Sequence, residues 1–99
     1  MTVKFNIAIV GCGRISKKHF EAIELNNKNL SLQAVCDIDE KVCLNHKNKF
    51  NVPSFSSLKD LLECSELDLD IISLCTPSGL HAEQAMLIAK KNINIISEK

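Results

Sequence analysis

Two glycines near the start of the chain are placed where a phosphate group could be bound. Gly11 and Gly13 follow an apolar run and precede a segment with helical periodicity. Gly11 permits a tight turn, and Gly13 lets the backbone approach a pyrophosphate closely. The N-terminus of the following helix offers free N–H groups and a partial positive charge to that anion. Ser16 occupies the third small position, where glycine or alanine is usual, and is small enough for close packing. The pattern predicts a dinucleotide-binding loop.

An acidic residue at a suitable distance strengthens this prediction. Asp37 lies 24 positions beyond Gly13, directly after a second apolar run. A carboxylate there accepts hydrogen bonds from both adenosine ribose hydroxyls and repels a 2′-phosphate, which favours NAD over NADP. Asp39 is near enough to share this role, but a helix cap is the simpler interpretation for it. We therefore assign ribose binding to Asp37 and capping to Asp39.

The elements that must position these residues alternate between strand and helix. Strands are predicted at 5–10, 30–36, 71–75 and 93–96, with 52–55 at most an edge strand because it contains a proline. Amphipathic helices lie between them, with apolar faces formed by Ile15, His19, Ala22 and Ile23, by Val42, Cys43, His46 and Phe50, and by Ala82, Ala85, Met86 and Ala89. This order predicts an α/β fold, a Rossmann-like doubly wound parallel sheet whose ligands bind beyond the carboxyl ends of the strands.

Local signals mark where some of these helices begin and end. Ser57 with Asp60 resembles a capping box, and Ser78 after Pro77 is a suitable N-cap for the later helix. Asn92 can adopt the left-handed conformation that ends that helix.

A third chemical segment, Cys75–His81, follows the predicted strand at 71–75 and reads Cys-Thr-Pro-Ser-Gly-Leu-His. Together with residues 9–15, residues 36–39 and the terminal Glu98-Lys99, it resembles the glucose-fructose oxidoreductase, inositol dehydrogenase and rhizopine-catabolism (Gfo/Idh/MocA) family. These stretches, in this order and spacing, cover essentially the whole chain.

The resemblance implies roles for particular residues. Thr76 and Pro77 resemble a turn that lies along the cofactor near its nicotinamide side, in the loop that also holds Cys75 and His81. The predicted cofactor contacts also include Cys75 and His81, together with the glycine-loop residues Arg14 and Ile15. Without the family, His81 is equally well a solvated helix residue, and so is Arg14.

The two last residues carry the implied chemistry. Glu98 resembles the residue that binds the nicotinamide ribose, and Lys99 resembles the catalytic lysine beside the reacting carbon. A lysine there can orient a substrate hydroxyl, share its proton and stabilise a developing alkoxide. Composition alone makes the same two residues a charged tail.

The resemblance also implies what lies outside this sequence. Residues 1–99 form an incomplete N-terminal dinucleotide-binding domain, and the α/β substrate domain is absent from the chain. The fragment alone is then expected to be inactive, and the parent protein a homo-oligomer. The loop sequences are most similar to the sugar-nucleotide 3-dehydrogenase branch, which acts on UDP-N-acetylated hexoses or hexuronic acids in lipopolysaccharide sugar synthesis. Two alternatives stay open: a non-catalytic NAD-binding regulator of the same fold, and an S-adenosylmethionine methyltransferase.

Composition excludes several other classes of function. Twelve basic and 12 acidic residues balance, without the basic stripe of a nucleic-acid-binding protein or the cationic amphipathic segment of a membrane-surface protein. The apolar run near the N-terminus is too short for a signal peptide or membrane span, so a cytoplasmic location is expected. Five cysteines without a Cys-x-x-Cys pattern predict reduced, packed thiols rather than disulfides or a zinc site. His19 and His46 are predicted to be packing residues.

Overall fold

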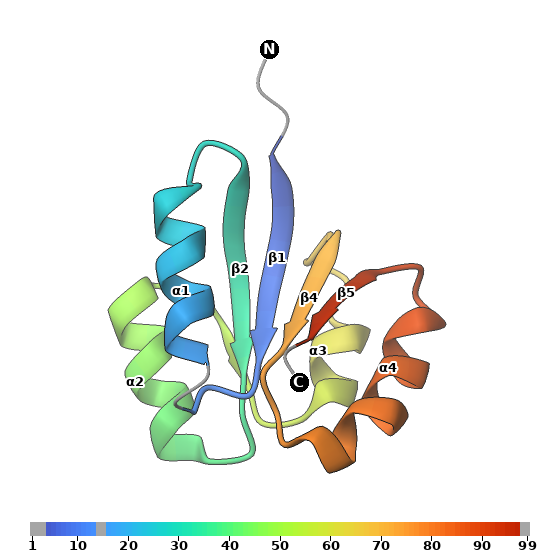
Figure 1. Cartoon of the computed structure of the whole chain (residues 1–99). Coiled ribbons are helices and arrows are strands. Elements are labelled where there is room, and N and C mark those ends of the chain that lie inside the picture. The colour runs from blue at the N-terminus through green and yellow to red at the C-terminus, as the bar shows by residue number, and fades with distance from the viewer. Residues whose placement is uncertain (1–3, 14–15, 98–99) are drawn as a thin grey trace.

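A computed structural model describes residues 4–13 and 16–97 of the chain. Strands and helices alternate along it (Figure 1), and the predicted α/β class is confirmed. The elements are β1 (Phe5–Val10), α1 (Ser16–Leu25), β2 (Leu30–Cys36), α2 (Glu40–Phe50), β3 (Ser54–Phe55), α3 (Leu58–Glu63), β4 (Ile71–Leu74), the 3₁₀ turn η1 (Ser78–Leu80), α4 (His81–Ala89) and β5 (Asn94–Ser97).

The five strands form one parallel sheet in the order β3-β2-β1-β4-β5. β1 lies at its centre, and its last four residues are buried because both faces of the sheet are covered. The chain winds outward from β1 first toward β3 and then, after crossing back, toward β5. The strand order therefore reverses beside β1, which is where parallel sheets of this kind bind ligands.

Helices cover both faces of the sheet (Figure 1). On one face Ile7, Ile9 and Val35 pack with Phe20 and Ile23 of α1. On the other face the alternate strand residues pack with α3 and α4, in a cluster of Ala8, Val10, Ala34, Cys36, Leu58, Leu61, Ile72, Leu74 and Ile88. Neighbouring residues of β1 thus face opposite layers, as the two-residue period of a strand requires.

The two predicted packing histidines lie on the face of the sheet that α1 and α2 cover. The ring of His46 lies 5.0 Å from that of Phe20, and its Nδ1–H donates to the carbonyl of Val42 at 2.9 Å. His19 Nδ1 is 2.5 Å from the hydroxyl of Ser73, which is 1% exposed on β4. His46 thus packs between α2 and α1, and His19 between α1 and β4. The prediction that both are packing residues is confirmed.

Several helix ends follow the expected chemistry. The Ser57 hydroxyl accepts from the backbone N–H of Asp60 at 3.1 Å and caps α3. Asn92 is left-handed, with φ 58°, beyond the end of α4. The predicted edge strand is also confirmed, although only Ser54 and Phe55 pair with β2.

Two predictions about α4 are wrong. The N-cap position of α4 is Leu80 rather than the predicted Ser78, because the Leu80 N–H bonds to the Pro77 carbonyl at 2.9 Å and closes a 3₁₀ turn, so α4 starts at His81. The predicted apolar face is also misplaced, since Met86 is 67% exposed and Ile88 is the fully buried residue. Alanines fit either side of a helix, so the branched Ile88 decides which side meets the sheet.

Candidate functional site

The first loop leaves β1 through a glycine that no other residue could replace without strain. Gly11 has φ +89°, and its N–H donates to the Cys36 carbonyl at 2.7 Å. A Cβ at this position would lie 2.8 Å from backbone atoms of Cys75 and Thr76. The loop after β1 is therefore pressed directly against the loop after β4.

Gly13 has the opposite environment. A Cβ built on it would meet nothing within 4 Å, so the space beside its backbone is open. Ser16 closes the turn behind it, since its N–H and its hydroxyl both donate to the Gly13 carbonyl, at 3.1 and 2.5 Å. Ser16 is 1% exposed, as the predicted close packing of α1 requires. Open space beside a glycine at the start of a helix suits a pyrophosphate.

Asp37 is held rigidly at the end of β2. Its Oδ2 accepts from the Cys12 N–H at 2.7 Å, and its Oδ1 accepts from the Asp39 N–H at 2.8 Å. Each carboxylate oxygen has a second lone pair left for a ligand. The half-buried side chain thus presents two fixed acceptors beside the glycine loop, the arrangement that a pair of ribose hydroxyls requires.

Asp39 has a different role. Its Oδ1 accepts from the backbone N–H groups of Lys41 and Val42 and caps α2. The side chain is exposed and does not line the cleft described below. The interpretation of Asp39 as a cap is confirmed.

Three side chains organise the loop after β4. The His81 Nε2–H donates to the Thr76 carbonyl at 2.6 Å, and the Thr76 hydroxyl donates to Gln84 Oε1 at 2.5 Å. His81 and Gln84 are three residues apart, so both project from the same side of α4. His81 supports the loop from behind and is not among the residues that line the cleft.

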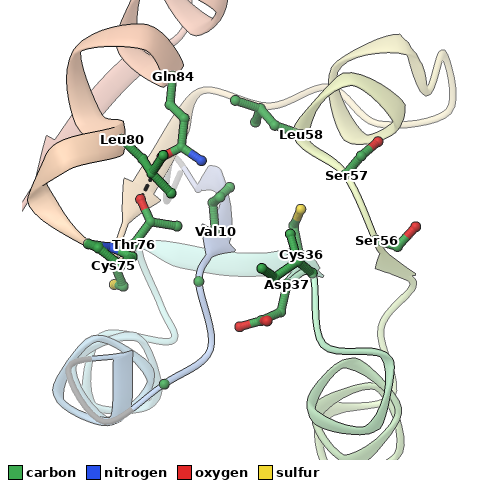
Figure 2. A pocket seen from close by; sticks show the side chains of 14 residues that line it. Val10, Cys36, Asp37, Ser56, Ser57, Leu58, Cys75, Thr76, Leu80 and Gln84 are labelled. Atoms are coloured by element: carbon green, nitrogen blue, oxygen red, sulfur yellow. Dashed lines mark hydrogen bonds between the residues drawn. The ribbon is translucent and has the colours of Figure 1, made fainter.

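These loops enclose one apolar cleft of about 460 Å³ at the carboxyl edge of the sheet (Figure 2). Ligand sites of this size commonly combine apolar walls with a few fixed polar groups. The cleft brings together Gly11, Gly13, Asp37, Cys75, Thr76 and Pro77 from the predicted set. Its other lining residues are Val10, Cys36, Ile38, Ser56, Ser57, Leu58, Leu80 and Gln84.

Most of the lining residues that the sequence did not predict lie at the carboxyl ends of the strands. Val10, Cys36 and Ile38 lie at or just beyond the ends of β1 and β2, and Ser56 follows β3. That position in a parallel sheet is itself the signal that could have identified them. Gln84 carries no such signal, because it lies within α4.

Buried thiols surround Asp37. Burial raises the pKa of Cys12 and of Cys36 to about 12, and the nearby Asp37 carboxylate acts in the same direction. The pKa of Cys43 is also raised by burial, although its Sγ donates to the Asp37 carbonyl at 3.0 Å. The five cysteines form no disulfide, and these three remain protonated at neutral pH.

Four predicted site residues, Arg14, Ile15, Glu98 and Lys99, lie outside the described residues. Within the described ranges, no three histidine, cysteine or acidic side chains gather as a metal site requires. Each helix of those ranges is too short or too polar to span a bilayer.

Residues 5–99 match the model of the Gfo/Idh/MocA oxidoreductase family, described as an NAD-binding Rossmann fold. The chain belongs to this family. The predicted family, fold class and cofactor are confirmed, and the domain is an NAD-binding domain. Its geometry fits the dinucleotide, with open space at Gly13 and two oriented acceptors on Asp37. The match to an NAD-binding oxidoreductase family does not support the alternative of an S-adenosylmethionine methyltransferase.

Solved structures of two dehydrogenases are closely similar to this chain. The WlbA dehydrogenase of Bordetella pertussis, in complex with NADH and UDP-GlcNAcA, is 36% identical with a TM-score of 0.91, over 97% of this chain and 29% of that one. The scyllo-inositol dehydrogenase of Lactobacillus casei, with bound NAD(H) and scyllo-inositol, is 27% identical with a TM-score of 0.86, over 97% and 28%.

A curated relative from Bacillus subtilis, the uncharacterized oxidoreductase YrbE, is 28% identical over 100 residues, which are 100% of this chain and 28% of that protein. The chain thus spans less than a third of the length of these relatives.

Proposed function

We propose that the gene product is an NAD-dependent dehydrogenase that oxidises a secondary alcohol of a sugar nucleotide, at C3 of a UDP-N-acetylhexose or hexuronate. One observation carries the proposal: the cleft joins Gly11, Gly13, Asp37 and Thr76 in a chain 36% identical to an enzyme crystallised with NADH and a UDP-sugar acid. Inositol dehydrogenases of the same family support the wider class, which is oxidation of a ring alcohol.

In the proposed reaction, residues of the cleft bind the cofactor, and the two residues after β5 contact the nicotinamide ribose and the substrate. Bound NAD supplies the nicotinamide that accepts the hydride. Asp37 holds the adenosine ribose, and the open face of Gly13 admits the pyrophosphate. Glu98 and Lys99 come directly after β5 in the sequence. In this proposal Glu98 binds the nicotinamide ribose, and Lys99 orients the substrate hydroxyl and shares its proton as the hydride departs.

The test offers NAD and a panel of UDP-N-acetylated hexoses and hexuronic acids to the full-length gene product and follows NADH absorbance. Lys99→Ala is expected to lower kcat by roughly 10²–10⁴-fold, the usual contribution of general acid–base catalysis, with NADH still bound. Lys91→Ala is the matched control, because Lys91 is exposed and does not line the cleft.

Each contrary outcome identifies a different error. Full turnover by Lys99→Ala contradicts the role of Lys99. NADH binding without oxidation of any sugar nucleotide or polyol supports the non-catalytic regulator instead.

The remaining proposals concern the whole protein. A substrate domain beyond residue 99, a homo-oligomer and a cytoplasmic location stay predictions, as does use in lipopolysaccharide sugar synthesis. Residues 1–99 alone are expected to bind NAD weakly and to show no dehydrogenase activity. Measurable oxidation of a UDP-sugar by this fragment contradicts the need for a second domain.

A further inference from the structure

The hydrogen bond between Thr76 and Gln84 fixes the polarity of one wall of the cleft. A threonine hydroxyl has one proton to donate and two lone pairs to accept with. Here the proton goes to Gln84 Oε1, at a donor–acceptor distance of 2.5 Å. The Thr76 oxygen can therefore only accept a hydrogen bond from a ligand.

The rest of Thr76 has little freedom to change this arrangement. Its Cγ2 lies 2.9 Å, and its backbone N 2.8 Å, from where a Cβ on Gly11 would stand, so the residue is packed against the first loop. Its carbonyl accepts from His81 Nε2–H at 2.6 Å. With backbone and methyl both held, the partner of the hydroxyl decides which hydrogen-bonding group Thr76 presents.

Gln84 is the residue that accepts the proton of the Thr76 hydroxyl. It is half-buried, lines the cleft, and extends over Thr76 from the first turns of α4 (Figure 2). A polar side chain on the inward face of a helix, in a cleft that the apolar Leu58 and Leu80 also line, is costly unless it is hydrogen-bonded. The bond to Thr76 meets that requirement.

We propose that Gln84 is a positioning residue, whose carboxamide oxygen takes the Thr76 proton so that Thr76 accepts a hydrogen bond from a hydroxyl or amide group of the bound dinucleotide. This inference rests on the proposed contact between Thr76 and the cofactor. Gln84 acts through Thr76. The alternative is a direct contact, because the Gln84 carboxamide nitrogen is directed toward the cleft (Figure 2).

A double-mutant cycle on the full-length gene product separates the two roles, with the NADH dissociation constant as the readout. Gln84→Met keeps the length of the side chain and removes the acceptor, and Thr76→Val keeps the shape and removes the hydroxyl. Each is expected to weaken NADH binding about tenfold, the usual effect of one lost hydrogen bond. The double variant is expected to bind as Thr76→Val does, and Thr76→Ser, which keeps the hydroxyl, to retain most of the affinity.

Gln33→Met is the matched control. Gln33 is also partly buried and bonded to a hydroxyl, that of Ser31 at 2.7 Å, but it lies on β2 and does not line the cleft. It is expected to leave NADH binding unchanged and to show a similar shift in melting temperature to Gln84→Met.

Two results overturn the proposal: unchanged NADH binding by Gln84→Met, or losses that multiply to about a hundredfold in the double variant, as independent contacts would. Because the readout is cofactor binding alone, failure to find a sugar-nucleotide substrate does not affect this test.

Discussion

The loops after β1 and β4 meet in one cleft but are held in different ways. The loop after β1 depends on backbone geometry, since Gly11 has a positive φ and no room for a Cβ. The loop after β4 depends on side-chain hydrogen bonds from His81 to the backbone and from Thr76 to Gln84. Any side chain at Gly11 would clash with the loop after β4, whereas the two hydrogen bonds of that loop can be removed one at a time. Substitution of Gly11 should therefore remove most of the NADH binding at once, and substitutions in the loop after β4 should weaken it in steps.

Gly11→Ala is expected to have the largest effect. The added methyl would lie 2.8 Å from the backbone of the β4 loop in a conformation that alanine rarely adopts. The free energy of unfolding should fall by about 2–4 kcal/mol, and NADH binding should fall by more than about a hundredfold. Thermal unfolding and NADH titration measure both. Gly79→Ala, where a Cβ meets nothing within 4 Å, is the stability control. Equal melting temperatures for the two variants would contradict the steric argument.

Gly13→Ala should separate binding from stability. Since its Cβ meets nothing within 4 Å, the fold is expected to be unaffected, and only a pyrophosphate approaching the backbone would meet the new methyl. We expect NADH binding to weaken at least about tenfold with a melting temperature near that of the wild type. Undiminished binding of NADH would show that the pyrophosphate lies elsewhere.

Asp37→Ser tests the fixed carboxylate after β2, which is bonded to the loop after β1. Loss of its paired acceptors should weaken NADH binding about tenfold. Loss of its negative charge should also narrow the preference for NADH over NADPH, as parallel titrations with both cofactors measure. Asp39→Ser is the matched control, because serine also caps a helix and Asp39 does not line the cleft. An unchanged NADH-to-NADPH ratio in Asp37→Ser would exclude the ribose role.

His81→Ala is expected to have the smallest effect, because it removes one hydrogen bond behind the β4 loop. NADH binding should weaken by roughly three- to tenfold, corresponding to about 1 kcal/mol. The measurement is the same titration, with melting temperature recorded beside it. A loss as large as that of Gly11→Ala would mean that His81 binds the cofactor directly, as the family resemblance first indicated.

The sequence predicted those parts of the site that depend on local chemistry. Gly11 and Asp37 have the predicted places because a strand, a tight turn and a helix leave few alternatives. The face of α2 was also correct, since Cys43 is buried and His46 packs with Phe20.

The misplaced face of α4 shows where this reasoning fails. Alanines and Met86 carry a weak apolar signal, and the polar Gln84 faces inward because Thr76 bonds to it. That bond joins residues eight apart through an irregular loop. Its existence depends on the path of the backbone, which hydrophobic periodicity does not describe.

The exposed side chain of Ile38 has a thermodynamic consequence. It is 89% exposed although it lines the cleft beside Asp37, and Leu80 on the opposite wall is 44% exposed. A dinucleotide bound between them removes this apolar surface from water, and such burial lowers the heat capacity. The enthalpy of NADH binding should therefore become more favourable as the temperature rises, and calorimetry of Ile38→Ser at several temperatures would show a shallower slope.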